Sequence, residues 1–179
     1  MADVVDRLRT AAIGLTRAIE AAEERGAWGA DSPCEGWTAA DVADHIIGNY
    51  ASVAGTLGGD VTITGDRPRD WATARDAVLA AAVQDGALDT VVSSPGGPTP
   101  LGRFLAIYMQ LDTLLHTWDI ARAVGADESL DEELCRRCYE RFLPADETLR
   151  GTGAFGPKLD YSEEDPIQVK TLRFFGRPG

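Results

Sequence analysis

The sequence predicts an all-α fold, a helical bundle with a small β-hairpin insertion and additional helices near the C-terminus. Apolar residues recur at intervals of three and four over several long segments, and residues that begin or end helices flank these segments. One stretch, 86–102, combines a possible strand with glycines and prolines that are typical of turns. The 179 residues are 44% hydrophobic and 26% charged, so we expect a single globular domain over residues 1–179.

The first two helices have clear boundary signals. Apolar residues form one face from residue 3 to residue 25, and Gly26 follows as a stop signal. A second helix is expected over 38–57, because Thr38 followed by Asp41 resembles a capping box.

A third helix, a hairpin and a long helix are expected next. Asp70 is predicted to cap the third helix, which ends near Val83. The hairpin lies within 86–102, and one continuous helix follows over 100–124, with Gly125 at its end. Apolar residues occupy nearly every side of this helix, which predicts a central place in the bundle.

The C-terminal part predicts less regular structure. A fifth helix is expected over 131–143, with acidic residues in its first turn. The tail then reads as a loop until a short helix over 165–175.

Charge and hydropathy exclude several kinds of partner. A net charge of −12 and an isoelectric point near 4.5 repel nucleic-acid phosphates and anionic lipids, and the longest basic cluster is Arg136 and Arg137. No apolar run reaches the roughly 20 residues that cross a bilayer, and the N-terminal segment lacks the pattern of a signal peptide. We therefore expect a cytoplasmic protein that binds neither nucleic acid nor membranes. The sequence is compatible with a homodimer without specifying one.

The three cysteines are expected to be reduced in that compartment. Cys135 and Cys138 have the spacing of a redox pair, but such pairs usually lie between a strand and a helix, so ordinary placement in a helix is favoured. Cys34 precedes the nearest histidine, His45, by about three helical turns of sequence. A role for Cys34 as a ligand or reactive thiol is disfavoured, because the chain would have to fold back.

The segment "DTLLHTWDIARAVG" (112–125) carries three ionisable residues at helical spacing. At about 100° per residue, Asp112, His116 and Asp119 lie within an arc of about 60°, in line with apolar residues. One interpretation is a satisfied structural network, in which His116 and Asp112 pair with each other or with an arginine such as Arg122. The other is a divalent metal site, because a carboxylate and an imidazole four residues apart converge on one point. Spacing alone favours the network.

The second histidine of the chain adds to the metal interpretation. His45 lies in the middle of the helix predicted over 38–57, beside its apolar face. It could supply a third ligand from a neighbouring helix, which leaves an open position as in catalytic metal sites. The alternative is a histidine at the boundary of the core that bonds to Asp41 or to water.

Three segments carry a family resemblance: "SPCEGWTAADVADHIIGN" (32–49), "LDTLLHTWDIARAVG" (111–125) and the terminal "GAFGP" and "DPIQVKTLRFFGR". They resemble the actinobacterial metal-binding proteins related to mycothiol-dependent maleylpyruvate isomerase, within the DinB-like superfamily. The resemblance implies a DinB-like four-helix bundle that binds zinc or a similar divalent ion, with nickel and iron as the alternatives. The implied ligands are His45, Asp112 and His116, although relatives usually carry glutamate at the position of Asp112. Asp119 is then expected to orient His116 or a neighbouring arginine.

The resemblance also implies a function. A divalent ion would lower the pKa of a bound thiol and hold it as a thiolate, ready to attack an electrophilic carbon. The implied thiol is mycothiol, and the implied activity is that of an S-transferase or isomerase acting on a small electrophile. Two alternatives stay open: a non-catalytic stress or sensor protein that binds a metal or small ligand, and a metal-free structural domain.

Overall fold

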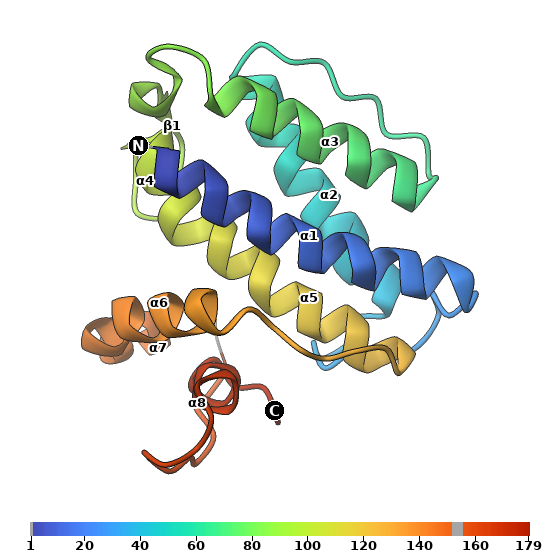
Figure 1. Cartoon of the computed structure of the whole chain (residues 1–179), viewed down its shortest axis with the longest axis vertical. Coiled ribbons are helices and arrows are strands. Elements are labelled where there is room, and N and C mark those ends of the chain that lie inside the picture. The colour runs from blue at the N-terminus through green and yellow to red at the C-terminus, as the bar shows by residue number, and fades with distance from the viewer. Residues whose placement is uncertain (1, 152–155) are drawn as a thin grey trace. The chain divides into compact units, whose positions relative to one another are not determined.

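Helices account for most of the structure, a computed structural model that describes residues 2–151 and 156–179 (Figure 1). Contacts within the chain divide it into two units, Met1–Ser129 and Leu130–Gly179, and each is described by itself. The expectation of a single domain over 1–179 stays a prediction.

The first unit is a four-helix bundle, which confirms the predicted all-α fold. Its long helices are α1 (Ala2–Glu24), α2 (Ala39–Thr56), α3 (Arg67–Ala82) and α5 (Gln110–Val124). Helix α1 packs against α5 and α3, and α2 packs against the same two helices (Figure 1). The order around the bundle is therefore α1, α5, α2, α3, so that α2 and α5 are direct neighbours.

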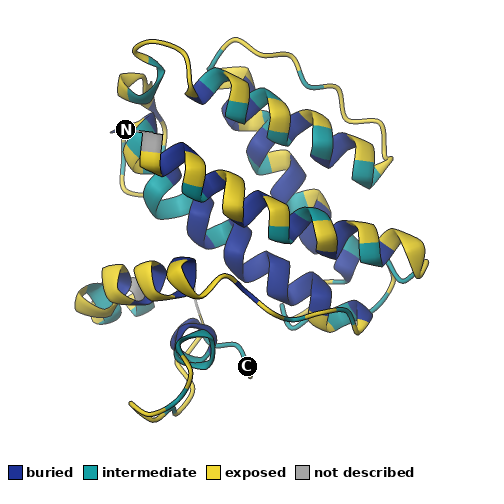
Figure 2. Ribbon diagram, in the orientation of Figure 1, coloured by how far each residue is buried: buried dark blue, intermediate teal, exposed yellow. Residues whose placement is uncertain are grey.

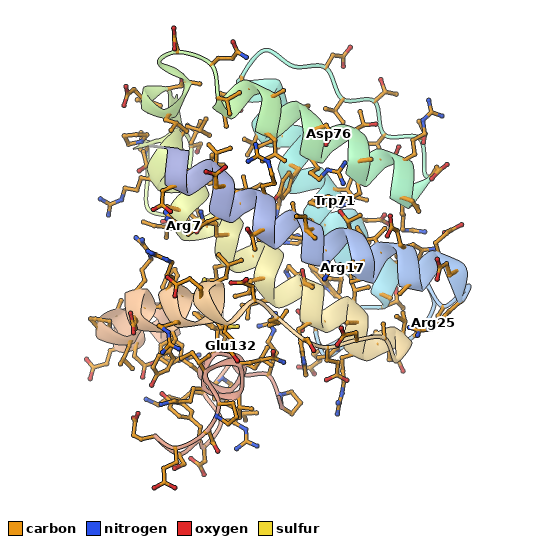
Figure 3. All side chains as sticks on the ribbon, viewed as in Figure 1. Arg7, Arg17, Arg25, Trp71, Asp76 and Glu132 are labelled. Carbon is orange, nitrogen blue, oxygen red and sulfur yellow. The ribbon has the colours of Figure 1, made fainter. Side chains whose placement is uncertain are left out.

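Two buried aromatic residues connect the four helices through their polar ends. The hydroxyl of Tyr50 on α2 lies 2.9 Å from that of Thr113 on α5. Trp71 projects from α3 toward α1, where its indole donates to the Thr16 hydroxyl over 2.8 Å (Figure 3). The rings of Tyr50 and Trp71 meet edge to face, with centroids 4.7 Å apart. Because an unpaired buried polar group costs about 1–3 kcal/mol, these bonds favour one alignment of the helices.

The predicted boundary signals of α2 and α5 are confirmed. The Thr38 hydroxyl accepts from the Asp41 N–H, and the Asp41 carboxylate accepts from the Thr38 N–H, which together form a capping box. Helix α5 ends at Gly125, whose φ of 66° lies in the left-handed region where glycine is favoured.

The predicted hairpin is also present. A short 3₁₀ turn, η1 (Ala87–Asp89), leads into β1 (Val91–Val92), which pairs antiparallel with β2 (Thr99–Pro100). This two-residue ladder is the small β insertion expected from the sequence.

The continuous α-helix predicted over 100–124 is interrupted. Leu101–Phe104 forms α4, Leu105–Met109 (η2) forms a π-helix, and α5 begins only at Gln110. A π turn closes its hydrogen bonds over five residues instead of four and therefore takes up one extra residue. The pattern of apolar residues does not reveal that difference.

The start of α3 also differs from the prediction. Its cap is Asp66, whose carboxylate accepts from the Arg69 N–H, rather than Asp70. Asp70 is instead buried and accepts from the backbone of Thr64 and Gly65. Both aspartates have the side chain of a capping residue, and the loop that wraps around Asp70 decides between them.

Burial follows the bundle. Buried residues line the inner faces of α1, α2 and α3, and α5 is buried along almost its whole length (Figure 2). Among the described helices, none combines the length and the apolar character that a membrane-crossing segment needs.

The second unit contains α6 (Glu132–Phe142), η3 (Leu143–Ala145), α7 (Asp146–Gly151) and α8 (Ile167–Phe174). Helices α6 and α8 pack together, with the rings of Tyr139 and Phe174 edge to face at 5.7 Å. The short α7 was not expected, because that part of the tail reads as a loop in the sequence. Residues 152–155, which include part of the "GAFGP" segment, lie outside the described residues.

Cys135 and Cys138 lie in α6, the ordinary helical placement that the sequence favours. Both thiols are buried, and burial raises the pKa of each to about 12. At neutral pH both are therefore held as thiols rather than as reactive thiolates.

Candidate metal centre

The four site residues predicted from the sequence lie on two neighbouring helices. Helix α2 carries His45, and α5 carries Asp112, His116 and Asp119. The side chains of His45 and Asp112 are 35% and 31% exposed, that of His116 is 10% exposed, and that of Asp119 is fully buried. The cluster therefore extends from the surface of the bundle into its interior.

The structure brings His45, Asp112 and His116 together. Nε2 of His45 lies 3.4 Å from Oδ2 of Asp112, and Nε2 of His116 lies 3.3 Å from Oδ1 of the same carboxylate. One ligand atom from each of the three residues lies within 4.8 Å of the others. The carboxylate thus lies between two imidazoles, one from each helix.

Asp119 contacts the opposite side of His116. Its Oδ2 accepts a hydrogen bond of 2.9 Å from Nδ1, so the proton stays on Nδ1 and Nε2 faces Asp112. Arg122, the arginine considered from the sequence, pairs instead with Glu128 at 3.0 Å. The contact with His116 is the one expected of Asp119, and its function there stays a prediction.

Asn49 is a further member of the cluster. Its amide donates to Nε2 of His45 over 3.0 Å and to Oδ2 of Asp112 over 2.9 Å. It follows His45 by one helical turn, so its position on the same face of α2 is visible in the sequence. Nothing in that spacing indicates that the amide reaches across to α5.

Trp37 forms an aromatic wall beside both histidines. Its ring centroid lies 5.2 Å from that of His45 and 6.3 Å from that of His116, and it stacks on His116 at an interplanar angle of 21°. The residue is 36% exposed. Its indole therefore packs beside both imidazole rings at the partly exposed end of the cluster.

Cys34 lies next to the cluster, contrary to the expectation that it would not fold back. Its Sγ donates to Oδ2 of Asp119 over 3.3 Å. The loop before α2 returns toward the bundle because it pairs with itself: the Ala39 N–H donates to the Ala30 carbonyl, and Asp31 bridges Thr38. The sequence separation between Cys34 and His45 therefore did not predict the position of this thiol.

The cluster favours charge separation between His116 and its carboxylates. Burial opposes the charge on Asp112, but the hydrogen bond from His116 and the charge of its ring outweigh burial and lower the pKa of Asp112. Burial likewise opposes the imidazolium of His116, but its bonds to Asp112, Asp119 and Cys34 raise the pKa of His116 well above its usual value. The two carboxylates thus favour the protonated form of the His116 imidazole.

Comparison with known proteins identifies a family and two relatives. The family described as "Mycothiol maleylpyruvate isomerase N-terminal domain" matches residues 8–70, a stretch that includes α2 and His45. The uncharacterized proteins Rv0738 and MT0763, from two strains of Mycobacterium tuberculosis, are each 30% identical to this chain over 142 residues. That stretch covers 77% of this chain and 75% of each relative.

The chain belongs to the mycothiol maleylpyruvate isomerase N-terminal domain family. The family resemblance seen in the sequence is therefore confirmed, together with the helical fold that it implies. No solved structure matches the chain. The family match ends at residue 70, so the placement of Asp112 and His116 beside His45 comes from the structure of this chain.

Proposed function

We propose that this protein binds a divalent metal ion through His45, Asp112 and His116. The bound ion would activate a small thiol, mycothiol, which is then transferred to a small electrophile or isomerises that electrophile. The observation that carries the proposal is the convergence of these three ligand atoms, from two facing helices, within 4.8 Å of one another. The family supplies the identity of the thiol.

The ligand set suits such an ion. Two imidazole nitrogens and one carboxylate oxygen are ligands that zinc, nickel and iron(II) accept, and three protein ligands leave a position for a substrate. Asp119 holds the proton on Nδ1 of His116, which is the support that a ligating histidine usually has. Because a ligating imidazole is neutral, the ion has to displace the proton that the carboxylates favour on His116.

A bound divalent ion would supply one chemical function, the stabilisation of a thiol sulfur as a thiolate near neutral pH. The residues of this chain would do the rest. Asp119 fixes the ring of His116, Asn49 orients His45 and Asp112, and the indole of Trp37 packs against the rings of both histidines.

Metal analysis tests the ligand set. Protein purified without a histidine tag is expected to bind about one divalent ion per chain, and His45→Ala and His116→Ala are expected to lose it. The matched control is Asp44→Asn, since Asp44 precedes His45 on α2 but pairs with Arg67 at 2.8 Å. A wild-type chain that binds no zinc, nickel or iron at stoichiometry would refute the proposal.

Activity is tested separately on the metal-loaded protein. With mycothiol and a panel of small electrophiles, we expect adduct formation or isomerisation above the uncatalysed rate, and loss of that excess in His116→Ala. Metal and thiol binding without any excess rate would identify a non-catalytic binding protein.

A metal-free network is the second candidate, and one observation favours it. The Asn49 amide already donates to both His45 and Asp112, while His116 pairs with Asp112 and Asp119, so each of these groups has a partner within the protein. If the cluster is structural, His45→Ala and His116→Ala will lower the free energy of unfolding equally with and without added metal.

A further inference from the structure

His116 contacts a different group through each of its ring nitrogens. Nε2 faces Asp112, whereas Nδ1 faces Asp119, which also contacts Cys34. The ligand atoms of Cys34, His116 and Asp119 lie within 4.8 Å of one another. A thiol therefore lies beside the carboxylate that holds the imidazole.

A single oxygen of Asp119 joins the thiol to the imidazole. Oδ2 accepts from Nδ1 of His116 over 2.9 Å and from Sγ of Cys34 over 3.3 Å. An ionised carboxylate can only accept, so the thiol must be the donor. Because the Asp119 side chain is fully buried, its orientation depends on the donors that surround it.

The main chain of the loop before α2 places Cys34. Its N–H donates to the Ser32 hydroxyl over 3.1 Å, and its carbonyl accepts from the Trp37 N–H over 3.0 Å. The Ser32 N–H in turn donates to the Trp37 carbonyl over 2.9 Å. The same turn thus positions the thiol and the aromatic wall of the cluster.

We infer that Cys34 is a positioning residue of the metal centre. Its thiol donates to Asp119 and keeps that carboxylate on Nδ1 of His116, so that Nε2 stays directed at Asp112 and His45. The inference about metal affinity rests on the proposed function, whereas the hydrogen bond between Asp119 and His116 exists without it.

The first test measures metal affinity in two substitutions. Cys34→Ala removes the donor and is expected to weaken Zn²⁺ binding about tenfold, at the low end of the 10- to 100-fold cost of losing a supporting partner. Cys34→Ser keeps a donor and is expected to restore affinity to within about threefold of wild type. Cys138→Ala, which removes a thiol of α6, is the control and should leave affinity unchanged.

The second test needs no metal. The proton on Nδ1 of His116 should give a downfield, slowly exchanging NMR signal in metal-free wild type and in Cys34→Ser, because it is held by a buried carboxylate. In Cys34→Ala this signal should move upfield or exchange faster. Should Cys34→Ala not fold, alkylating Cys34 in the folded wild type removes the same donor, since Cys135 and Cys138 are buried with pKa values of about 12.

The outcomes separate the two proposals. A wild type that binds no metal overturns the proposed function but leaves the NMR comparison to decide the contact of Cys34. If neither Cys34→Ala nor alkylation changes the Nδ1–H signal, or if Cys34→Ser behaves like Cys34→Ala, Cys34 is not a positioning residue.

Discussion

Two buried aspartates of the bundle are satisfied in different ways. Asp70 accepts from its own preceding loop, through the backbone of Thr64 and Gly65 and the Thr64 hydroxyl. Asp119 accepts from His116 on its own helix and from Cys34 in a distant loop. The first set of donors cannot ionise and fixes a loop, whereas the second set consists of an imidazole and a thiol, which are both ionisable groups.

Asp70 should therefore affect stability in a way that depends on pH. Burial opposes its charge, but the bonds from Thr64 and Gly65 outweigh burial and lower the pKa of Asp70. Its contribution is complete above the pKa of about 3.9 in the unfolded chain and is lost as pH falls through the lower pKa in the folded chain. At pH 7 we expect Asp70→Asn to reduce the free energy of unfolding by about 1–3 kcal/mol in urea titrations.

The difference between Asp70→Asn and wild type should narrow when the urea titrations are repeated below about pH 4. Asp76→Asn provides the control, because Asp76 also lies on α3 but is exposed and pairs with Arg75 (Figure 3). A difference that stayed constant between pH 7 and pH 3 would show that the carboxylate charge is not what holds the loop.

Residues of the candidate site could be predicted where helices carry them. His45, Asp112 and His116 stand out because helical spacing fixes their faces, and the structure brings them together. Cys34 and Trp37 could not be placed, because their positions depend on hydrogen bonds between loop residues and not on any periodicity.

At the scale of elements, the start of α2 holds the loop that carries part of the site. The capping box of Thr38 and Asp41 begins the helix directly after Trp37, and the bridge between Asp31 and Thr38 closes the loop behind it. The cap therefore connects the stability of α2 to the position of the thiol and the indole.

Thr38→Ala should lower the free energy of unfolding by about 1 kcal/mol, because it leaves a helix N–H without its side-chain acceptor. Thr56→Ala is a matched control at the other end of α2, where the hydroxyl donates only to the Ser52 carbonyl of its own helix. Thermal and urea unfolding would measure both substitutions. Equal effects at the two ends would contradict a special role for the cap.

Helix boundaries were predicted correctly where a capping side chain specifies them. They were predicted wrongly where the conformation of the preceding loop selects the capping residue. Thr38 and Gly125 have specific capping functions, and the structure confirms both. The choice between Asp66 and Asp70 depends on how the loop before α3 folds, which the sequence pattern does not specify.

At the scale of the whole molecule, the strong negative charge governs long-range interactions. With a net charge of −12, we expect the chain to repel nucleic acids within the Debye length, about 8 Å at physiological salt. Fluorescence anisotropy with duplex DNA and single-stranded RNA should therefore detect no binding at 0.15 M salt. Binding that weakens steeply as salt is added would show a basic surface that the composition conceals.

The helical fold could be predicted from the sequence, whereas the separation of the chain into two units could not. Three amphipathic helices and one helix that is apolar on nearly every side have few ways to bury their apolar surface, so the helical class was predictable. The separation at Leu130 was not, because residues 126–131 differ little in composition from the other loops.

The π turn of Leu105–Met109 changes the direction in which side chains point before and after it along the helical segment from α4 to α5. One extra residue in a helix rotates everything before it by about 100° relative to everything after it. The hairpin and α4 precede this turn, whereas Asp112 and His116 follow it within α5. Insertion or deletion of one residue at the π turn would therefore rotate the hairpin about the helix axis. The positions of Asp112 and His116 relative to each other on α5 would not change.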